Sequence, residues 1–168
     1  PAPGTGYAAE LDGATSSTMY QSVTSSSTIG MYFKFKPSAL PSGAERQIIA
    51  LTNNTPIVQS SLKIFADGTL QIWGDGAAHS VTTDNGLSVG TIYHIWIDWT
   101  KGTGSDGTYS VGFSTDGTKP SSGGNYKSGS DGAPTANVTR CYIEFKGGIG
   151  TDPAGAVDDI FVSNSPIG

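Results

Sequence analysis

The chain has 168 residues, enough for one domain with its own hydrophobic core. Its formal net charge is −5 and its nine Lys and Arg residues form no run, which argues against nucleic acid as a partner. The single cysteine, Cys141, excludes an internal disulfide and a cysteine-based zinc site.

The composition predicts an all-β protein. The chain has 24 Gly residues and only 14% charged residues, and no long window carries apolar residues at helical spacing. No transmembrane run or signal peptide is present, so we expect no membrane insertion. Residues 1–6 have the composition of a linker or the remnant of a processed leader, and residues 7–168 are expected to form a single β-sandwich domain.

Alternation of apolar and polar residues predicts the first strands. Tyr7 to Asp12 and Thr18 to Val23 can each be extended. Between Ile29 and Phe35 every second residue is large and apolar, which predicts a strand with one core face. Pro37 is expected to end that strand.

A hairpin is predicted next, after a short apolar strand at Gln47 to Thr52. Leu62 to Ala66 and Thr69 to Trp73 flank an Asp-Gly pair, which is typical of a tight β-turn. Their alternation directs one set of side chains to the core and the other away from it. The core set is Leu62, Ile64, Leu70 and Ile72, and the opposite set is Lys63, Phe65, Gln71 and Trp73. His79 to Thr83 is a weaker strand.

The run from Tyr93 to Thr100 has the clearest period of two. Its core side is expected to hold Tyr93, Ile95, Ile97 and Trp99. The other side carries His94, Trp96 and Asp98, an unusual set to leave in water unless a ligand binds there.

The last third of the chain resumes the alternation at Tyr109, Val111 and Phe113. Residues 118–137 read as one long polar loop. Arg140 to Lys146 is predicted to direct Cys141, Ile143 and Phe145 inward and Arg140, Tyr142 and Glu144 outward. Val157 to Val162 forms a final strand that is expected to pair near the first one.

Many short antiparallel strands at regular spacing predict an antiparallel two-sheet β-sandwich, a jelly roll. The order of several landmarks resembles that of laminin-G-like, concanavalin-A-like domains. These landmarks are Ala9 to Gly13, Met31 to Pro37, Phe65 to Leu70, Tyr93 to Thr100 and Val157 to Ile160. The resemblance implies two large antiparallel sheets and a frequent role in binding carbohydrate outside the cell. The resemblance does not by itself settle the function, because domains with this fold perform many different functions.

The leading hypothesis is non-catalytic binding of a polysaccharide or glycan by a lectin-like module. A sugar site combines an aromatic platform with polar donors and acceptors. Trp73 and Trp96 are candidates for the platform, and this interpretation expects Trp96 to be open to a ligand. The polar candidates are Gln71, His94, Asp98, Arg140, Tyr142 and Glu144. Whether these residues converge depends on the strand order, which alternation does not give.

Enzymatic alternatives have less support. The glycosidases of this fold carry two glutamates and an aspartate alternating on one strand, and the three glutamates of this chain form no such pattern. A polysaccharide lyase needs a His or Tyr base and a cation. His94, Tyr142, Arg140 and Lys63 are candidates for these roles, although Trp73 stands where jelly-roll alginate lyases carry a histidine.

No cofactor is expected to be required, but a structural calcium ion is possible. Carbohydrate modules with this sandwich often hold one where the first and last strands meet. Glu10 or Asp12 near Asp158 resembles that arrangement, although such aspartates can also simply cap turns.

The rival hypothesis is a structural or adhesion domain that decorates a virion or cell surface. Residues 107–115 and the loop after them are similar to laminin-G-like domains of phage and environmental bacteria. Either hypothesis expects a secreted, cell-surface or virion-surface protein. Besides glycan, its partners would be other modules of a larger protein or identical subunits, bound through sheet edges and apolar side chains.

Overall fold

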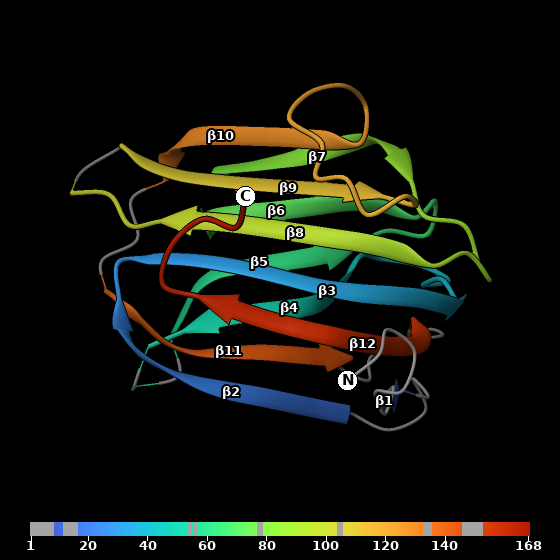
Figure 1. Cartoon of the computed structure of the whole chain (residues 1–168), viewed down its shortest axis with the longest axis horizontal. Coiled ribbons are helices and arrows are strands. Elements are labelled where there is room, and N and C mark those ends of the chain that lie inside the picture. Colours follow the sequence, from blue (N-terminus) through green and yellow to red (C-terminus); the bar gives the residue numbers. More distant parts are fainter. Residues whose placement is uncertain are drawn as a thin grey trace.

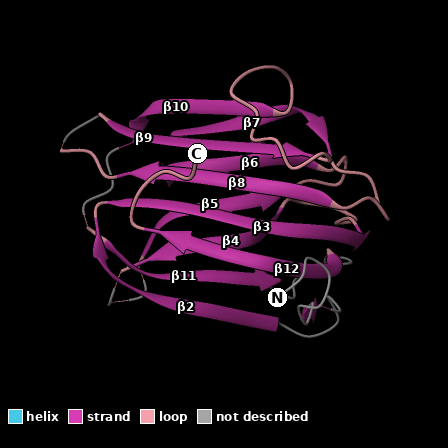
Figure 2. Cartoon of the chain, viewed as in Figure 1, coloured by secondary structure: helices cyan, strands magenta, loops and turns pink. Residues whose placement is uncertain are grey.

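The computed structural model describes residues 9–11, 17–53, 55, 57–76, 79–103, 106–132, 136–145 and 153–168. Residues 1–6, expected to be a linker, therefore lie outside the described residues. No helix that could span a membrane is found in the described part of the chain. All of its regular structure is β-strand (Figure 2).

Twelve strands among these residues form two six-stranded antiparallel sheets, as predicted (Figure 1). Sheet A has the order β1-β12-β3-β8-β9-β10. Its strands are β1 (Ala9–Leu11), β3 (Thr28–Ala39), β8 (Tyr93–Thr100), β9 (Gly107–Ser114), β10 (Tyr126–Gly132) and β12 (Ala154–Ser163).

Sheet B lies behind sheet A in the view of Figure 1 and has the order β2-β11-β4-β5-β6-β7. Its strands are β2 (Ser17–Ser26), β4 (Arg46–Thr52), β5 (Val58–Ile64), β6 (Thr69–Gly76), β7 (His79–Gly86) and β11 (Val138–Phe145). The strands that are neighbours in sequence are therefore often not neighbours in a sheet.

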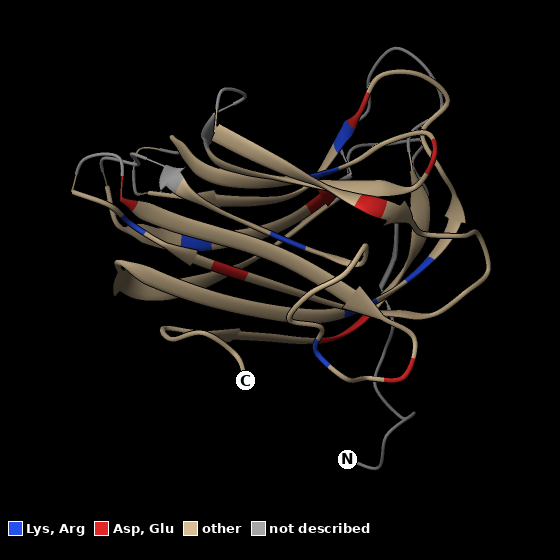
Figure 3. Cartoon of the chain, turned by 90° about the horizontal axis from the view of Figure 1, so that it is seen from above, with Lys and Arg blue, Asp and Glu red and all other residues tan. Residues whose placement is uncertain are grey.

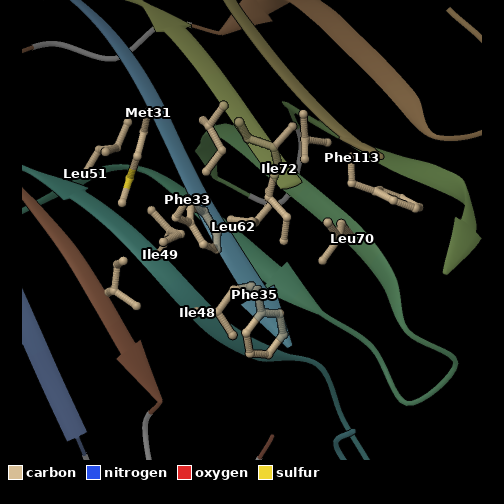
Figure 4. Packing of buried hydrophobic residues seen from close by; sticks show 14 of the residues in the cluster. Met31, Phe33, Phe35, Ile48, Ile49, Leu51, Leu62, Leu70, Ile72 and Phe113 are labelled. Carbon is tan, nitrogen blue, oxygen red and sulfur yellow. The ribbon is translucent and has the colours of Figure 1, made fainter. Parts of the chain in front are cut away.

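The core fills the space between the two sheets (Figure 4). The predicted inward residues with described side chains are confirmed, since Ile29, Phe33, Ile64 and Leu70, for example, are fully or almost fully buried. The side chain of Phe145, also predicted inward, lies outside the described residues. Cys141 is also buried, and this burial raises the pKa of its thiol to about 12. It is therefore an inert core side chain and not a nucleophile.

The first and last strands of the chain pair with each other, as expected. Residues 9–11 of β1 pair with β12 in antiparallel register, so that Glu10 lies opposite Ala156. The side chain of Glu10 and all of Asp12 lie outside the described residues. Asp158 follows directly in β12, where its Oδ1 accepts a hydrogen bond from the Asp159 amide.

Two strand predictions are wrong. Residues 118–137 are not one loop, because β10 occupies Tyr126–Gly132 and pairs with β9. Pro37 does not end β3, which continues to Ala39. Beyond Phe35, β3 pairs with β12 but no longer with β8, so the missing N–H of Pro37 removes no hydrogen bond on that side.

Charged residues are scattered over the surface and the turns of the described chain (Figure 3). Several of them form pairs of opposite sign, such as Lys34 with Asp159 at 2.5 Å and Lys127 with Asp84 at 3.0 Å.

Candidate functional site

The eight predicted ligand-binding residues fall into two groups on opposite outer faces of the sandwich. His94, Trp96 and Asp98 are on β8 and point away from the core of sheet A. Gln71 and Trp73 on β6, and Arg140, Tyr142 and Glu144 on β11, point away from the core of sheet B. One ligand cannot contact both groups, because the hydrophobic core lies between them.

The outer face of sheet A is covered over β8 by two chain segments. A side chain at Gly117 would touch the His94 ring, Pro120 lies over Gly112, and Lys119 reaches Asp98 with its ammonium group. Residues 117–120 therefore run past Trp96. The expectation that Trp96 is open to a ligand is wrong, because its exposed fraction is only 5%.

The second covering segment is the C-terminal one, which crosses the front of sheet A in Figure 1. Asp98 anchors it: Oδ2 lies 2.6 Å from the Lys119 ammonium, and Oδ1 accepts a hydrogen bond from the Ile167 amide at 3.2 Å. Lys119 also donates to the Ile167 carbonyl. Asp98 thus has a structural partner for each of its oxygens.

Asp98→Ala is expected to lower the free energy of unfolding by about 1–3 kcal/mol, because it leaves the Ile167 amide without its acceptor and removes the ion pair of Lys119. Amides of residues 163–168 should then exchange with deuterium faster than in the parent chain. Asp84→Ala is the matched control, since its pair with Lys127 is more exposed and should contribute little. Equal effects of the two substitutions would contradict this role of Asp98.

His94 belongs to an aromatic cluster under the same cover. Its Nδ1 lies 2.8 Å from the Tyr32 hydroxyl oxygen, and its ring stacks on Trp96 with centroids 6.1 Å apart. Burial lowers the pKa of His94, and the nearby Lys34 ammonium lowers it further, so the imidazole is neutral near pH 7. The cluster is a packed layer on the outer face of sheet A.

A cavity of about 450 Å³ opens beside this cluster. Of the predicted ligand-binding residues, only His94 lines this cavity. Lys34, Lys36, Ile92 and Asp158 are among its other lining residues. Charges of both signs line it, and Lys34 already pairs with Asp159. Its aromatic lining residues are Phe35, a core side chain that is 1% exposed, and His94, so no exposed Trp or Tyr ring of the kind expected for a sugar lines it.

The outer face of sheet B brings the second group together. The strand registers place six outward residues directly opposite one another from β2 to β7, and we call them the aromatic row. They are Tyr20, Tyr142, Ala50, Ser61, Trp73 and Ser80. Since neighbouring strands are about 4.8 Å apart, Trp73 and Tyr142 start about 14 Å from each other.

The centre of the aromatic row is closed to solvent. Ala50 and Ser61 point away from the core and yet are only 3% and 2% exposed, so other groups of the chain cover them. The Tyr142 ring also lies against the Tyr20 ring, with centroids 5.5 Å apart. Tyr20 itself is 63% exposed and forms the open end of the row.

Trp73 is held in place from two sides. Its indole Nε1 donates to Gln71 Oε1 at 2.6 Å, and the Lys63 ammonium lies 3.5 Å from the ring centroid. Lys63 is in turn 3.1 Å from Glu45. These contacts restrain the indole, so a ligand that stacks on it would order few additional groups.

A second row of outward residues runs beside the first, and we call it the polar row. It consists of Thr18, Glu144, Gln47, Lys63, Gln71 and Thr82. Hydrogen bonds link its members: Gln47 donates to Glu144, and Gln71 donates to Thr82 Oγ1 at 3.1 Å. The row presents amide and hydroxyl groups along the flank of the aromatic row, whereas Glu144 is buried, with an exposed fraction of 6%, and is not open to a ligand.

Arg140 lies on the other flank. Its guanidinium carbon is 5.9 Å from the Tyr20 ring centroid, and its Nη1 is 3.5 Å from the Tyr142 hydroxyl. The face therefore offers aromatic rings between hydrogen-bonding groups on both sides. Tyr20 and Gln47 were missed as candidates. Alternation in its strand already places Tyr20 on the outward side, whereas Gln47 is outward only because of a register shift between Gln47 and Ile49 that alternation does not reveal.

The calcium expectation remains a prediction. The described residues contain no group of three or more His, Cys, Asp or Glu side chains that could hold a metal ion. Two of the three expected ligands, Glu10 and Asp12, fall among the side chains that are not described.

The fold is shared with solved structures of low sequence identity. No family model and no curated protein matches the chain. A SAP-like pentraxin from Limulus polyphemus is 14% identical with a TM-score of 0.59, over 90% of this chain and 71% of that one. The LG1-3 region of the laminin alpha2 chain is 12% identical with a TM-score of 0.62, over 94% and 31% of the two chains.

An endo-beta-1,4-glucuronan lyase from Trichoderma reesei is 12% identical with a TM-score of 0.59, over 96% of this chain and 88% of that one. These likenesses confirm the laminin-G-like, concanavalin-A-like jelly roll. Because the set contains both an enzyme and proteins whose names state no reaction, the fold alone does not assign an activity.

Proposed function

We propose that this protein binds a polysaccharide without cleaving it, on the outer face of sheet B. The observation that carries the proposal is the aromatic row, flanked by the polar row and by Arg140. Pyranose rings present apolar C–H faces to aromatic side chains and hydroxyl groups to amides, carboxylates and guanidinium groups. Both kinds of contact are available side by side on this face.

The geometry favours a ligand that lies across the strands. Trp73, Tyr142 and Tyr20 follow one line over five strands, and the two residues between Trp73 and Tyr142 are too small to interrupt it. The backbones of Trp73 and Tyr142 are about 14 Å apart, which is longer than one sugar ring. An extended glycan chain of several units therefore fits better than a single monosaccharide.

Binding without catalysis is supported by the separation of the reactive groups. His94 lies on sheet A and Tyr142 on sheet B, so the two candidate lyase bases cannot act on one substrate. On the binding face Lys63 pairs with Glu45 and Glu144 accepts from Gln47. These charged groups already have protein partners, which suits a fixed recognition surface.

We infer that the protein works outside the cell, as a surface module or part of a larger secreted protein. Support comes from the composition, rich in Ser, Thr, Gly and Asn with little Lys, and from the sharing of its fold with a pentraxin and a laminin region.

Affinity electrophoresis against neutral and acidic polysaccharides tests the proposal, with calcium and with a chelator. We expect retardation by one class of polysaccharide and no rise in absorbance at the unsaturated-uronate band. A rise in absorbance would identify a lyase. Free migration on every polysaccharide would contradict sugar binding and favour a structural or adhesion role.

A further inference from the structure

The four edge strands of the two sheets differ in how they are protected. An edge strand presents unpaired N–H and C=O groups, and proteins usually shield it by short length, charge or cover. β1 has only three residues. β7 and β10 lie against each other, linked by Asp84 with Lys127 and by Asn85 Nδ2 with Asn125 Oδ1 at 2.6 Å.

Within the described part of the chain, the fourth edge, β2, has none of these protections. It is ten residues long, about twice the usual length of a strand, and contains no charged residue and no Pro. The sequence has no Lys, Arg, Asp or Glu from Gly13 to Phe33. β2 pairs with β11 on one side, and within the described residues no strand pairs with its other side.

The core also opens at this edge. An apolar cavity of about 230 Å³ lies between β2 and β12, and it reaches buried side chains of both sheets. Met19, Met31, Cys141, Ile143, Ile160 and Val162 line it. Ile160, which also lines the cavity, is 40% exposed, which is unusual for a large apolar side chain.

We propose that β2 pairs with β2 of a second copy of this chain in antiparallel register, which joins the two six-stranded B sheets into one. Antiparallel pairing of identical strands obeys two-fold symmetry and is self-complementary. A second copy of the chain suits an edge strand without charges, because pairing two such strands brings no like charges together. A charged partner strand would find no opposite charge on β2 itself.

A register with Gln21 opposite its own copy shows that the side chains are compatible. It places Met19 opposite Val23 and Tyr20 opposite Ser22, and keeps the two faces of the sheet aligned. Met19 and Val23 both pack partly against the core, so this register extends the apolar layer across the interface. The outer faces of both B sheets would then form one continuous surface. The proposed dimer does not depend on sugar binding.

Sedimentation velocity from about 1 to 200 µM tests the dimer. The parent chain should sediment as a dimer in the upper part of this range. The variant Ser22→Lys/Thr24→Lys changes two exposed positions. In the register above it places charges opposite Tyr20 and Thr18 of the second copy, and the two substituted Ser22 positions are diagonal neighbours across the interface, so we expect its dissociation constant to rise more than about tenfold. Ser121→Lys/Ser122→Lys, in an exposed loop, is the control with the same change in charge.

Hydrogen exchange locates the interface. Every second amide of β2 points away from β11, and these amides should be protected in the concentrated parent chain but not in the Ser22→Lys/Thr24→Lys variant. Circular dichroism shows whether each variant keeps its fold. The proposal is overturned if the parent chain stays monomeric at 200 µM, or if the edge variant dimerises as tightly as the loop control.

Discussion

Trp73→Ala is expected to abolish retention by the polysaccharide that the parent chain binds. The indole is the largest ring of the aromatic row, and it is restrained by Gln71 and Lys63 before any ligand arrives. Removing a pre-ordered aromatic anchor at the centre of a binding surface typically costs about 2–4 kcal/mol of binding free energy. This corresponds to a loss of affinity of roughly 30-fold to 1,000-fold.

The binding loss should come without unfolding. Trp73 is only partly buried and lies outside the core, so the thermal midpoint should fall by a few degrees at most, about 1 kcal/mol in free energy. Trp73→Phe keeps a flat ring and should retain part of the affinity. Affinity electrophoresis and isothermal titration calorimetry on both variants measure the effect.

Thr108→Ala is a matched control, because Thr108 is an exposed outward residue of sheet A. It should bind as the parent chain does. If Trp73→Ala bound the polysaccharide with unchanged affinity, sugar binding on this face would be wrong, whatever the panel of polysaccharides had shown.

Trp96→Ala is expected to have the opposite profile, with a large loss of stability and no loss of polysaccharide affinity in the folded fraction. Trp96 lies under residues 117–120 and packs against Tyr32, with ring centroids 5.4 Å apart, and against His94. Truncating a buried tryptophan typically costs about 3–5 kcal/mol. For a domain of this size the thermal midpoint would fall by roughly 10 °C.

Differential scanning calorimetry measures this fall, and binding is then assayed at a temperature where the variant is folded. Trp96→Phe should recover more than half of the lost stability, because it refills most of the space with an aromatic ring. A midpoint within about 2 °C of the parent chain for Trp96→Ala would mean that Trp96 is not part of the packed layer on sheet A.

The alternation of residue types predicted strand faces well, because a side chain in a strand points to one side or the other. Leu62, Ile64, Leu70 and Ile72 are buried as expected, and Gln71 and Trp73 are outward. The prediction of strands failed where a segment is extended because it pairs with a neighbouring strand and not because of its local sequence pattern. β10 has the composition Tyr-Lys-Ser-Gly-Ser-Asp-Gly, with no apolar alternation, and it is extended because it pairs with β9.

The binding face depended on information that alternation does not contain. Trp73 and Tyr142 are 69 positions apart in the sequence and share a row because β4 and β5 lie between their strands with Ala50 and Ser61 in register. Trp96 has the same outward position in its strand as Trp73. It is nevertheless buried, because Lys119 and Ile167 bring two distant segments to Asp98 beside it.

The sequence by itself determined the fold class and the side of its strand to which most side chains point, since these follow from composition and from the two-residue period of an extended backbone. Only the tertiary structure decided which outward residues meet and which remain accessible. Strand order and the path of covering segments arise from contacts between residues far apart in the chain, and those contacts leave no local pattern in the sequence. Thus His94, Trp96 and Asp98 became part of a covered layer, and Trp73, Tyr142 and Tyr20 became one face.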